Sequence, residues 1–381
     1  MGGTVRTVVN SANYLSTHGY DVEIISVRKT NAKPLFSIHH NIKITPLFDA
    51  RRGKTYYQGM PFYKKLAKRI LLKVPSFIID RTEDLYRMFS LFTDIKIIRK
   101  IKSIKEGVLV TTIPSFNIIA TKYANPNVII IGQEHKYFDG HGKNLQKKIK
   151  KHYPKLHALT LLTDSEIEVY KQVLGAEGGV KLYKLENATE IPIESSSLDN
   201  KVVIAAGRFV EQKGFDLLIQ AFSQVIKKHP DWKLKIFGSG RLEGFLRQQI
   251  VSLEAYNNIY LMPQTDNILN EMLKSSIYVL SSRYEPFGMV IIEAMSVGVP
   301  CVSFACSGPR EIIQHNVDGI LVDEGDINGL AESINKVIED VEFRKYLGRN
   351  AKINAQKYSL ERVGKKWEEL LMGLSQTKQV L

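Results

Sequence analysis

The chain has 381 residues, a length typical of two or three domains. Its 44% hydrophobic content, without a low-complexity run or a solenoid-length repeat, excludes disordered and repeat proteins. No apolar run approaches the roughly 20 residues of a membrane-spanning helix and no signal peptide is visible, so we expect a cytoplasmic protein. The only cysteines, Cys301 and Cys306, fit neither a zinc pair nor a disulfide framework, which indicates buried thiols in a reducing compartment.

The positive charge is confined to the first half of the chain. Residues 1–190 contain 31 Lys and Arg against 16 Asp and Glu, a net charge of +15, and the remainder contains 22 against 23, a net charge of −1. This asymmetry favours an anionic surface or an anionic polymer as a partner. Nucleic acid is the weaker alternative, because no helix-turn-helix, RNA-recognition or zinc pattern accompanies the charge. We therefore expect no nucleic-acid partner.

The chain opens with Gly2-Gly3-Thr4, followed by a helical apolar pattern that ends at Gly19 and by a strand over residues 22–27. In a doubly wound domain, a glycine-rich turn follows the first, central strand and approaches a phosphate. Here the strand before Gly2 is missing, which predicts a truncated chain or a misassigned start codon. Two hypotheses for the glycines stay open, a loose terminus and a phosphate loop.

Further strands are predicted in the first half at residues 42–46, 108–113, 128–132 and 159–163. Helical patterns alternate with them, which indicates a parallel sheet built from βαβ units. His135 follows one of these strands on a loop at the carboxyl edge of the sheet, where open α/β sheets bind ligands. A solvated loop histidine is the alternative, and His141 is close enough in sequence to compete for the same role.

The most basic segment runs from Arg51 to Val74. Within it Phe62, Leu66 and Ile70 recur at every fourth position, and lysines and arginines occupy the other faces of the predicted helix. Two interpretations remain open. Such a helix can lie on an anionic bilayer, with its apolar side chains in the interface and its lysines at the headgroups. Alternatively, it is a surface helix that packs its apolar face on the sheet.

Residues 187–200 are polar and aperiodic, which predicts a linker between domains. The second half then alternates strands and helices regularly. Arg208 and Lys213 flank a single loop at the carboxyl end of its first strand, where two cations can bind a diphosphate. The final helical pattern contains Trp367, either as an interdomain anchor or packed within the second domain.

The stretch from Ser281 to Glu311 carries the most information. It predicts the end of a buried strand, a loop that contains Glu285, and a helix that begins at Phe287-Gly288 and contains Glu293. The N-terminus of a helix is a natural place for a phosphate. No D-x-D metal motif is present, and the acidic residues of 318–326 indicate a turn, so we expect neither a metal ion nor another cofactor.

The E-x7-E spacing of Glu285 and Glu293, within S-R-Y-E-P-F-G-x-x-x-x-E-A-M-x-x-G-x-P, resembles family 4 of the retaining, nucleotide-sugar-dependent glycosyltransferases. The family's G-R-x-x-x-x-K-G pattern is matched at Gly207 to Gly214. The resemblance implies the α/β GT-B fold, in which two Rossmann-like domains face each other across a cleft. It assigns residues 1–190 to an acceptor-binding domain, residues 191–360 to a nucleotide-sugar-binding domain, and residues 361–381 to a helix that crosses back to the first.

The resemblance also assigns roles to individual residues. Glu285 and His135 are expected to be catalytic. The expected donor-binding residues are Gly3, Arg208, Lys213, Gln264, Phe287, Gly288, Met289, Val290 and Glu293.

The implied activity is the retaining, metal-independent transfer of a hexose or an N-acetylhexosamine from a nucleotide-sugar donor, with UDP-sugar expected. The acceptor would be a hydroxyl of a glycan, a wall polymer or a polyprenyl-linked acceptor, presented at the inner face of the plasma membrane. Because the first strand is missing, the alternative is a truncated or catalytically silent accessory protein that keeps the fold and binds a partner.

Overall fold

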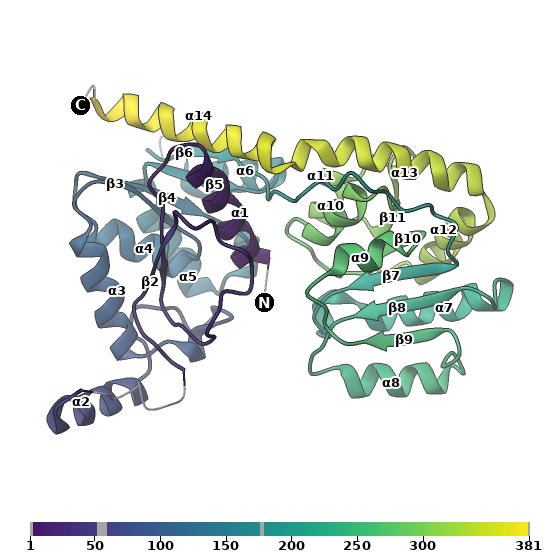
Figure 1. The fold of residues 1–381 in the computed structure, drawn as a ribbon, viewed down its shortest axis with the longest axis horizontal. Helices are drawn as coiled ribbons and strands as arrows, with labels where there is room; N and C mark the ends of the chain where they lie inside the picture. Colours follow the sequence, from purple (N-terminus) through teal and green to yellow (C-terminus); the bar gives the residue numbers. More distant parts are fainter. Residues whose placement is uncertain (1–2, 52–58, 176–178, 380–381) are drawn as a thin grey trace. The chain divides into compact units, whose positions relative to one another are not determined.

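The computed structural model describes residues 3–51, 59–175 and 179–379 (Figure 1). The chain divides into two compact units, unit 1 with Met1–Glu186 and Gly364–Leu381, and unit 2 with Asn187–Val363. It leaves unit 1 after Glu186 and returns after Val363, whereas the sequence placed these boundaries after residues 190 and 360. Within the described ranges, no helix combines the length and the apolar composition that crossing a membrane requires.

Unit 2 is organised around one six-stranded sheet with the order β12-β11-β10-β7-β8-β9. All neighbouring strands in it are parallel. The strands are β7 (Val202–Ala206), β8 (Lys233–Phe237), β9 (Ile259–Met262), β10 (Ile277–Leu280), β11 (Cys301–Phe304) and β12 (Gly319–Val322). Most of them are unbroken apolar runs, because the strands of a parallel sheet are buried on both faces. Every residue of β10, for example, is buried.

The helices of unit 2 connect these strands, and their apolar stripes cover the sheet. In α7, the buried residues Leu218, Phe222 and Val225 recur at helical spacing and belong to the same core as strand residues Val203 and Ile236. The helices are α7 (Phe215–Lys228), α8 (Glu243–Ser252), α9 (Ile268–Leu273), α10 (Met289–Ser296), α11 (Ser307–Ile312), α12 (Ile327–Glu339) and α13 (Val341–Ala355).

Unit 1 contains a four-stranded parallel sheet with the order β3-β4-β5-β6, and a separate parallel ladder of β1 and β2. The strands are β1 (Glu23–Ser26), β2 (Lys43–Pro46), β3 (Gly107–Thr111), β4 (Val128–Gln133), β5 (Ala158–Leu161) and β6 (Lys181–Lys184). The helices are α1 (Gly3–Thr17), α2 (Phe62–Lys73), α3 (Leu91–Ser103), α4 (Pro114–Tyr123), α5 (Lys143–His152), α6 (Asp164–Leu174) and most of α14 (Leu360–Gln379). The α/β class and the parallel sheets predicted from the sequence are confirmed.

Helix α14 completes unit 1. Trp367 is buried and donates a hydrogen bond from Nε1 to Ser11 Oγ of α1 at 3.0 Å. Gly364 lies so close to Tyr14 that an added Cβ would meet its ring at 2.3 Å. The alternative that Trp367 packs within the second domain is therefore wrong.

Two strands were missed in the sequence. Strand β6 is short and carries lysine at both ends. The acidic segment 318–326 contains β12 (Gly319–Val322), so the prediction of a simple turn there is wrong. Asp318 is buried before this strand, accepting hydrogen bonds from the Gln314 backbone at 2.8 Å and from Asn354 at 2.7 Å. Charged residues beside a four-residue strand hide the apolar pattern by which strands are recognised.

Candidate functional site

The candidate site of unit 2 lies where the strand order changes direction. From β7 the chain moves outward through β8 to β9, and then crosses to β10 on the other side of β7. Open α/β sheets bind ligands at such a switch point, outside the carboxyl ends of the strands. The loop after β7 carries Arg208 and Lys213, and the loop after β10 carries Glu285. The topology therefore brings together residues that are more than seventy positions apart in sequence.

The loop after β7 packs directly against the end of β10. Arg208 is exposed, and Lys213 closes a single 3-10 turn, Glu211–Lys213. Gly214 follows with a positive φ of 59°, and a Cβ on it would lie 2.0 Å from the Ser281 carbonyl oxygen. Only glycine allows both this backbone conformation and this close approach. The glycine after Lys213 thus sets how near that lysine lies to the loop of Glu285.

Lys213 and Glu285 form an ion pair. Lys213 Nζ lies 2.5 Å from Glu285 Oε2, with side chains that are only 15% and 12% exposed. Ser282 Oγ also donates to the same carboxylate oxygen at 3.3 Å. A lysine and a glutamate held together at a partly buried position keep both charges in place before a ligand arrives. The pair offers a cation for a phosphate and a carboxylate for hydroxyl groups.

Arg283 fastens the two loops to each other. Its guanidinium makes a bidentate ion pair with Asp216 at the start of α7, with NH1 to Oδ1 at 2.8 Å and NH2 to Oδ2 at 2.6 Å. NH1 also donates to the Glu211 carbonyl oxygen at 2.8 Å, and the Arg283 backbone N–H donates to the Gln212 carbonyl oxygen at 2.8 Å. Bidentate pairing fixes direction as well as distance. Arg283 therefore holds the loop of Lys213 in register with the loop of Glu285.

Helix α10 begins beside these loops. Its N-cap, Gly288, has a φ of 106°, and the N–H groups of Met289 and Val290 belong to the first turn. Phe287 is buried, with its ring centroid 5.8 Å from that of Tyr358. Glu293 lies further along the helix and is only 3% exposed. A Cβ on Gly288 would lie 3.6 Å from Glu285 Cγ, so the helix begins next to the Lys213–Glu285 pair, and a helix N-terminus is suited to bind an anion.

Gln264 lies on the same edge of the sheet but further from the switch point. It is exposed and follows β9, which is separated from β7 by β8. At about 4.8 Å per strand, this separation is about 10 Å. The predicted donor-binding residues Lys213 and Gln264 therefore follow separate strands.

Two predicted site residues lie in unit 1. His135 follows β4 and is half-buried, and its Nε2 atom has no hydrogen-bond partner among the described residues. Burial lowers the pKa of His135 to about 4, so the imidazole is neutral near pH 7. Gly3 is the first residue of α1, and Gly2 lies outside the described residues. The competing residue, His141, is buried with its Nε2 3.3 Å from Glu134 Oε2, and so is already occupied.

A buried polar cluster around Glu134, at the carboxyl ends of β4 and β5, was not found from the sequence. Glu134 is 3% exposed and accepts hydrogen bonds from Tyr153 OH and, at 3.4 Å, from Asn117 Nδ2. Burial raises the pKa of nearby Glu166 to about 7, and the charge of Glu134 acts in the same direction. The segment Gln133-Glu134-His135 after an apolar strand was the only signal, because Tyr153 and Glu166 belong to no motif.

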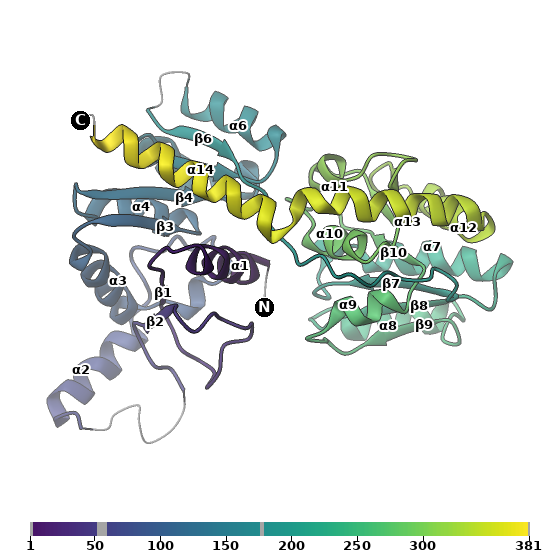
Figure 2. The same ribbon diagram turned by 45° about the horizontal axis from the view of Figure 1, so that its top comes forward.

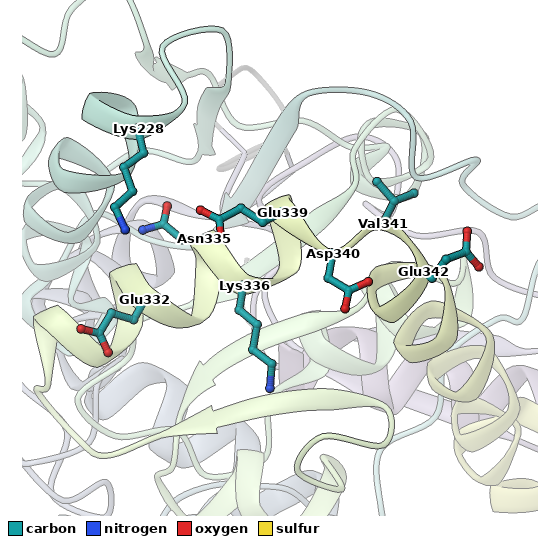
Figure 3. Close-up of a pocket in the computed structure, with 8 residues that line it drawn as sticks. All are labelled: Lys228, Glu332, Asn335, Lys336, Glu339, Asp340, Val341 and Glu342. Carbon is teal, nitrogen blue, oxygen red and sulfur yellow. The ribbon is translucent and has the colours of Figure 1, made fainter.

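A separate hollow of about 690 Å³ on unit 2 lies over the last turns of α7 and α12 and the start of α13 (Figure 3). Its lining includes Lys228, Asn335, Glu339 and Glu342. The last turn of α7 leads back toward the amino ends of the strands, because α7 returns the chain to the next parallel strand, β8, and α12 packs beside α7. The hollow is therefore at the opposite edge from the candidate site.

In the part of the chain that the structure describes, no group of three or more His, Cys, Asp and Glu side chains is placed to hold a metal ion. The chemical groups that the site of unit 2 offers are cations, helix N–H groups and two carboxylates. Such a set can bind a diphosphate on one side and hydroxyl groups on the other.

Comparisons with known proteins identify the family of this chain. The family model described as "Glycosyl transferases group 1" matches residues 187–354, the part of the chain that contains the site of unit 2. An exopolysaccharide phosphotransferase of Streptomyces coelicolor is 31% identical over 378 residues, or 98% of this chain, which spans 40% of the length of that relative. An uncharacterised glycosyltransferase of Methanocaldococcus jannaschii is 30% identical over 304 residues, or 72% of this chain and 70% of the relative.

Among solved structures, Staphylococcus aureus TarM, a mutant in complex with fondaparinux, α-GlcNAc-glycerol and UDP, is 18% identical with a TM-score of 0.76. The match covers 97% of each chain. This likeness shows the shared GT-B fold of two α/β units. Together with the family model and the relatives, it shows that the chain belongs to the group 1 glycosyltransferases.

Proposed function

We propose that the chain is a retaining glycosyltransferase of family 4 that uses a nucleoside diphosphate sugar, with UDP as the nucleotide. The observation that carries the proposal is the meeting of Lys213, Glu285 and the first turn of α10 at the switch point of unit 2. Cations and helix N–H groups there would neutralise the diphosphate as it leaves, without rearrangement during the reaction. Such preorganised charge supports transfer without a metal ion.

In the proposed reaction, the bond from the anomeric carbon to the donor's phosphate oxygen breaks, and a bond to the acceptor hydroxyl oxygen forms on the same face of the sugar. The hydroxyl proton passes to a phosphate oxygen of the leaving nucleoside diphosphate. Glu285 orients the donor sugar, and Glu293 accepts hydrogen bonds from the ribose hydroxyls. Gln264 lies toward the base, and Arg208 joins Lys213 at the diphosphate.

The resemblance assigns His135 to the donor sugar as well. The neutral imidazole that its lowered pKa of about 4 gives near pH 7 supports this role. A neutral ring can accept or donate a hydrogen bond, and it adds no positive charge beside an anomeric carbon that is becoming cationic.

We further propose that the transferred group is a hexose or an N-acetylhexosamine and that the acceptor is a hydroxyl of a surface polymer or a lipid-linked glycan, met at the inner face of the membrane. TarM, with UDP and α-GlcNAc-glycerol in its complex, supports the choice of an N-acetylhexosamine and a UDP donor. The exopolysaccharide phosphotransferase of Streptomyces coelicolor supports a surface polysaccharide. The excess of basic residues in 1–190 also supports an anionic acceptor or surface.

Titration calorimetry of the full chain with UDP, GDP and ADP tests the donor site. We expect UDP to bind and Glu293→Gln to weaken it about 10- to 100-fold, because a charge-assisted hydrogen bond to the ribose is lost without a change in side-chain size. The matched control is Glu342→Gln, an exposed residue of the hollow in Figure 3, which should bind UDP normally.

Release of UDP from UDP-glucose or UDP-N-acetylglucosamine then separates an enzyme from a silent binding protein with the same fold. A folded chain that binds no nucleoside diphosphate would contradict the proposal. UDP binding without turnover on any glycan acceptor would favour the accessory alternative.

A further inference from the structure

Helix α2 of unit 1 turns its apolar face to solvent. Phe62, Leu66 and Ile70 lie four residues apart and therefore share one face, and their side chains are 80%, 48% and 55% exposed. Tyr63, beside them, is 66% exposed. In both views α2 stands out from the remainder of unit 1 (Figures 1 and 2). A surface helix normally buries its apolar stripe on its own core, so the alternative interpretation, in which this face packs on the sheet, is wrong.

The face of α2 that packs on unit 1 is built around a lysine. Lys68 is 8% exposed, and its ammonium lies 5.1 Å from the ring centroid of Phe48 and 5.7 Å from that of Phe92. Burial, together with the charge of Lys96, lowers the pKa of Lys68. Cation–π contacts of this kind fix the rotation of the helix. That rotation leaves the apolar stripe on the outside.

Basic side chains border the exposed stripe. Lys65, Arg69 and Lys73 are exposed on α2, and the sequence of the helix contains no acidic residue. We call these three residues together with Phe62, Tyr63, Leu66 and Ile70 the α2 face. Apolar side chains with long cationic side chains along their border match a lipid interface, because the apolar groups enter the acyl boundary while lysine and arginine extend to the headgroups.

We propose that the α2 face docks on the surface of a bilayer that contains anionic lipids. Charge complementarity selects this occupant: the face is cationic and lies in the half of the chain that carries +15 of its net charge. A second copy of the chain would bring the same cations together and would be repelled. The inference goes beyond glycosyl transfer and rests on the proposed function only for the nature of the acceptor that would be met there.

The test is co-sedimentation of the full chain with vesicles of phosphatidylcholine alone or mixed with phosphatidylglycerol. We expect binding to the mixed vesicles that weakens with added salt. The double variants Leu66→Ser/Ile70→Ser and Lys65→Ser/Arg69→Ser should each lose about tenfold or more in binding, because the first removes the inserted groups and the second removes two headgroup contacts.

Matched controls lie on exposed helix positions of unit 2. Phe245→Ser/Val251→Ser removes two apolar side chains, 54% and 62% exposed, and Lys227→Ser/Lys228→Ser removes two charges. Both control variants should bind vesicles as the parent chain does. All four changes are at the surface, so the melting temperature and UDP affinity should remain normal and separate this test from that of the donor site.

Equal binding of the parent chain and the two α2 variants would overturn the proposal, as would binding that does not depend on phosphatidylglycerol. A dimer in solution that Leu66→Ser/Ile70→Ser dissociates would also overturn it, in favour of a second copy as the occupant. Vesicle binding by a chain that binds no UDP would leave the docking face intact and contradict only the proposed function.

Discussion

The carboxyl edge of the sheet is built differently in the two units. In unit 2 its charges are matched in ion pairs near the surface, Lys213 with Glu285 and Arg283 with Asp216. In unit 1 the carboxylates of Glu134 and Glu166 are buried, and among the described residues neither has a lysine or arginine partner. The first arrangement keeps charges ready for an anion, whereas the second raises the pKa of Glu166 and favours its neutral form. Charged side chains are thus accessible at the site of unit 2, whereas burial in unit 1 favours the neutral form of Glu166.

The largest effect on activity is expected from the loss of the Lys213 cation at the site of unit 2. Lys213→Met should lower kcat/KM for the nucleotide sugar by about 10²- to 10³-fold, because a preorganised cation at the leaving group is lost. Lys227→Met, an exposed lysine on α7, is the matched control and should leave the rate unchanged. Steady-state kinetics of UDP release provide the measurement, and a change of less than about threefold in Lys213→Met would contradict the role.

The raised pKa of Glu166 in unit 1 predicts that the stability of the chain depends on pH. The folded pKa of Glu166 is about 7, above its ordinary value of 4.5. The contribution of Glu166 to the free energy of unfolding is therefore fully present below pH 4.5 and is lost as the pH rises to about 7. The loss is about 2–3 kcal/mol. Glu166→Gln should remove this loss and be more stable than the parent chain above pH 7.

Urea unfolding at about pH 5 and about pH 8 measures the effect. The matched control is Glu168→Gln, an exposed residue on the same helix, which should keep the parental pH dependence. An unchanged slope in Glu166→Gln would show that this carboxyl is ionised in the folded chain.

The smallest of the three effects is expected from the ion pair that joins the loop of Lys213 to the loop of Glu285. Arg283→Ala and Asp216→Asn should each lower kcat/KM about tenfold, because either change releases the loop of Lys213 from that of Glu285. The double variant should be little worse than the poorer single variant, since both changes remove one interaction. Losses that multiply in the double variant would show that the two residues act separately.

The fold and the candidate site are easier to predict from the sequence in unit 2 than in unit 1. In unit 2 most strands are short apolar runs and the loops carry a spaced motif, so the sequence predicted every strand of the sheet except β12 and proposed site residues at its carboxyl edge. Arg283 lies within that motif, but its role depends on Asp216, and no pattern joins two residues so far apart. In unit 1 the cluster of Glu134, Tyr153 and Glu166 comes from three separate segments, and only folding shows that they meet.

The orientation of α2 could not be predicted for a related reason. Periodicity gives the apolar stripe of a helix but not the direction in which it faces. The cation–π contacts of Lys68 with Phe48 and Phe92 decide that direction here, and they join positions in three separate segments of the chain. Binary patterning alone would place the charged residue outside and the apolar residues inside, the opposite of what the structure shows.

The return of the chain to unit 1 at Gly364 has a consequence for synthesis on the ribosome. Residues 187–363 of unit 2 are contiguous, but unit 1 is built from segments on both sides of them, with Trp367 of α14 packed on Ser11 of α1. Domains generally fold as units in the order in which they emerge. Here unit 2 can be completed before unit 1, because α1 stays without its packing partner Trp367 until the residues that follow Val363 have left the exit tunnel.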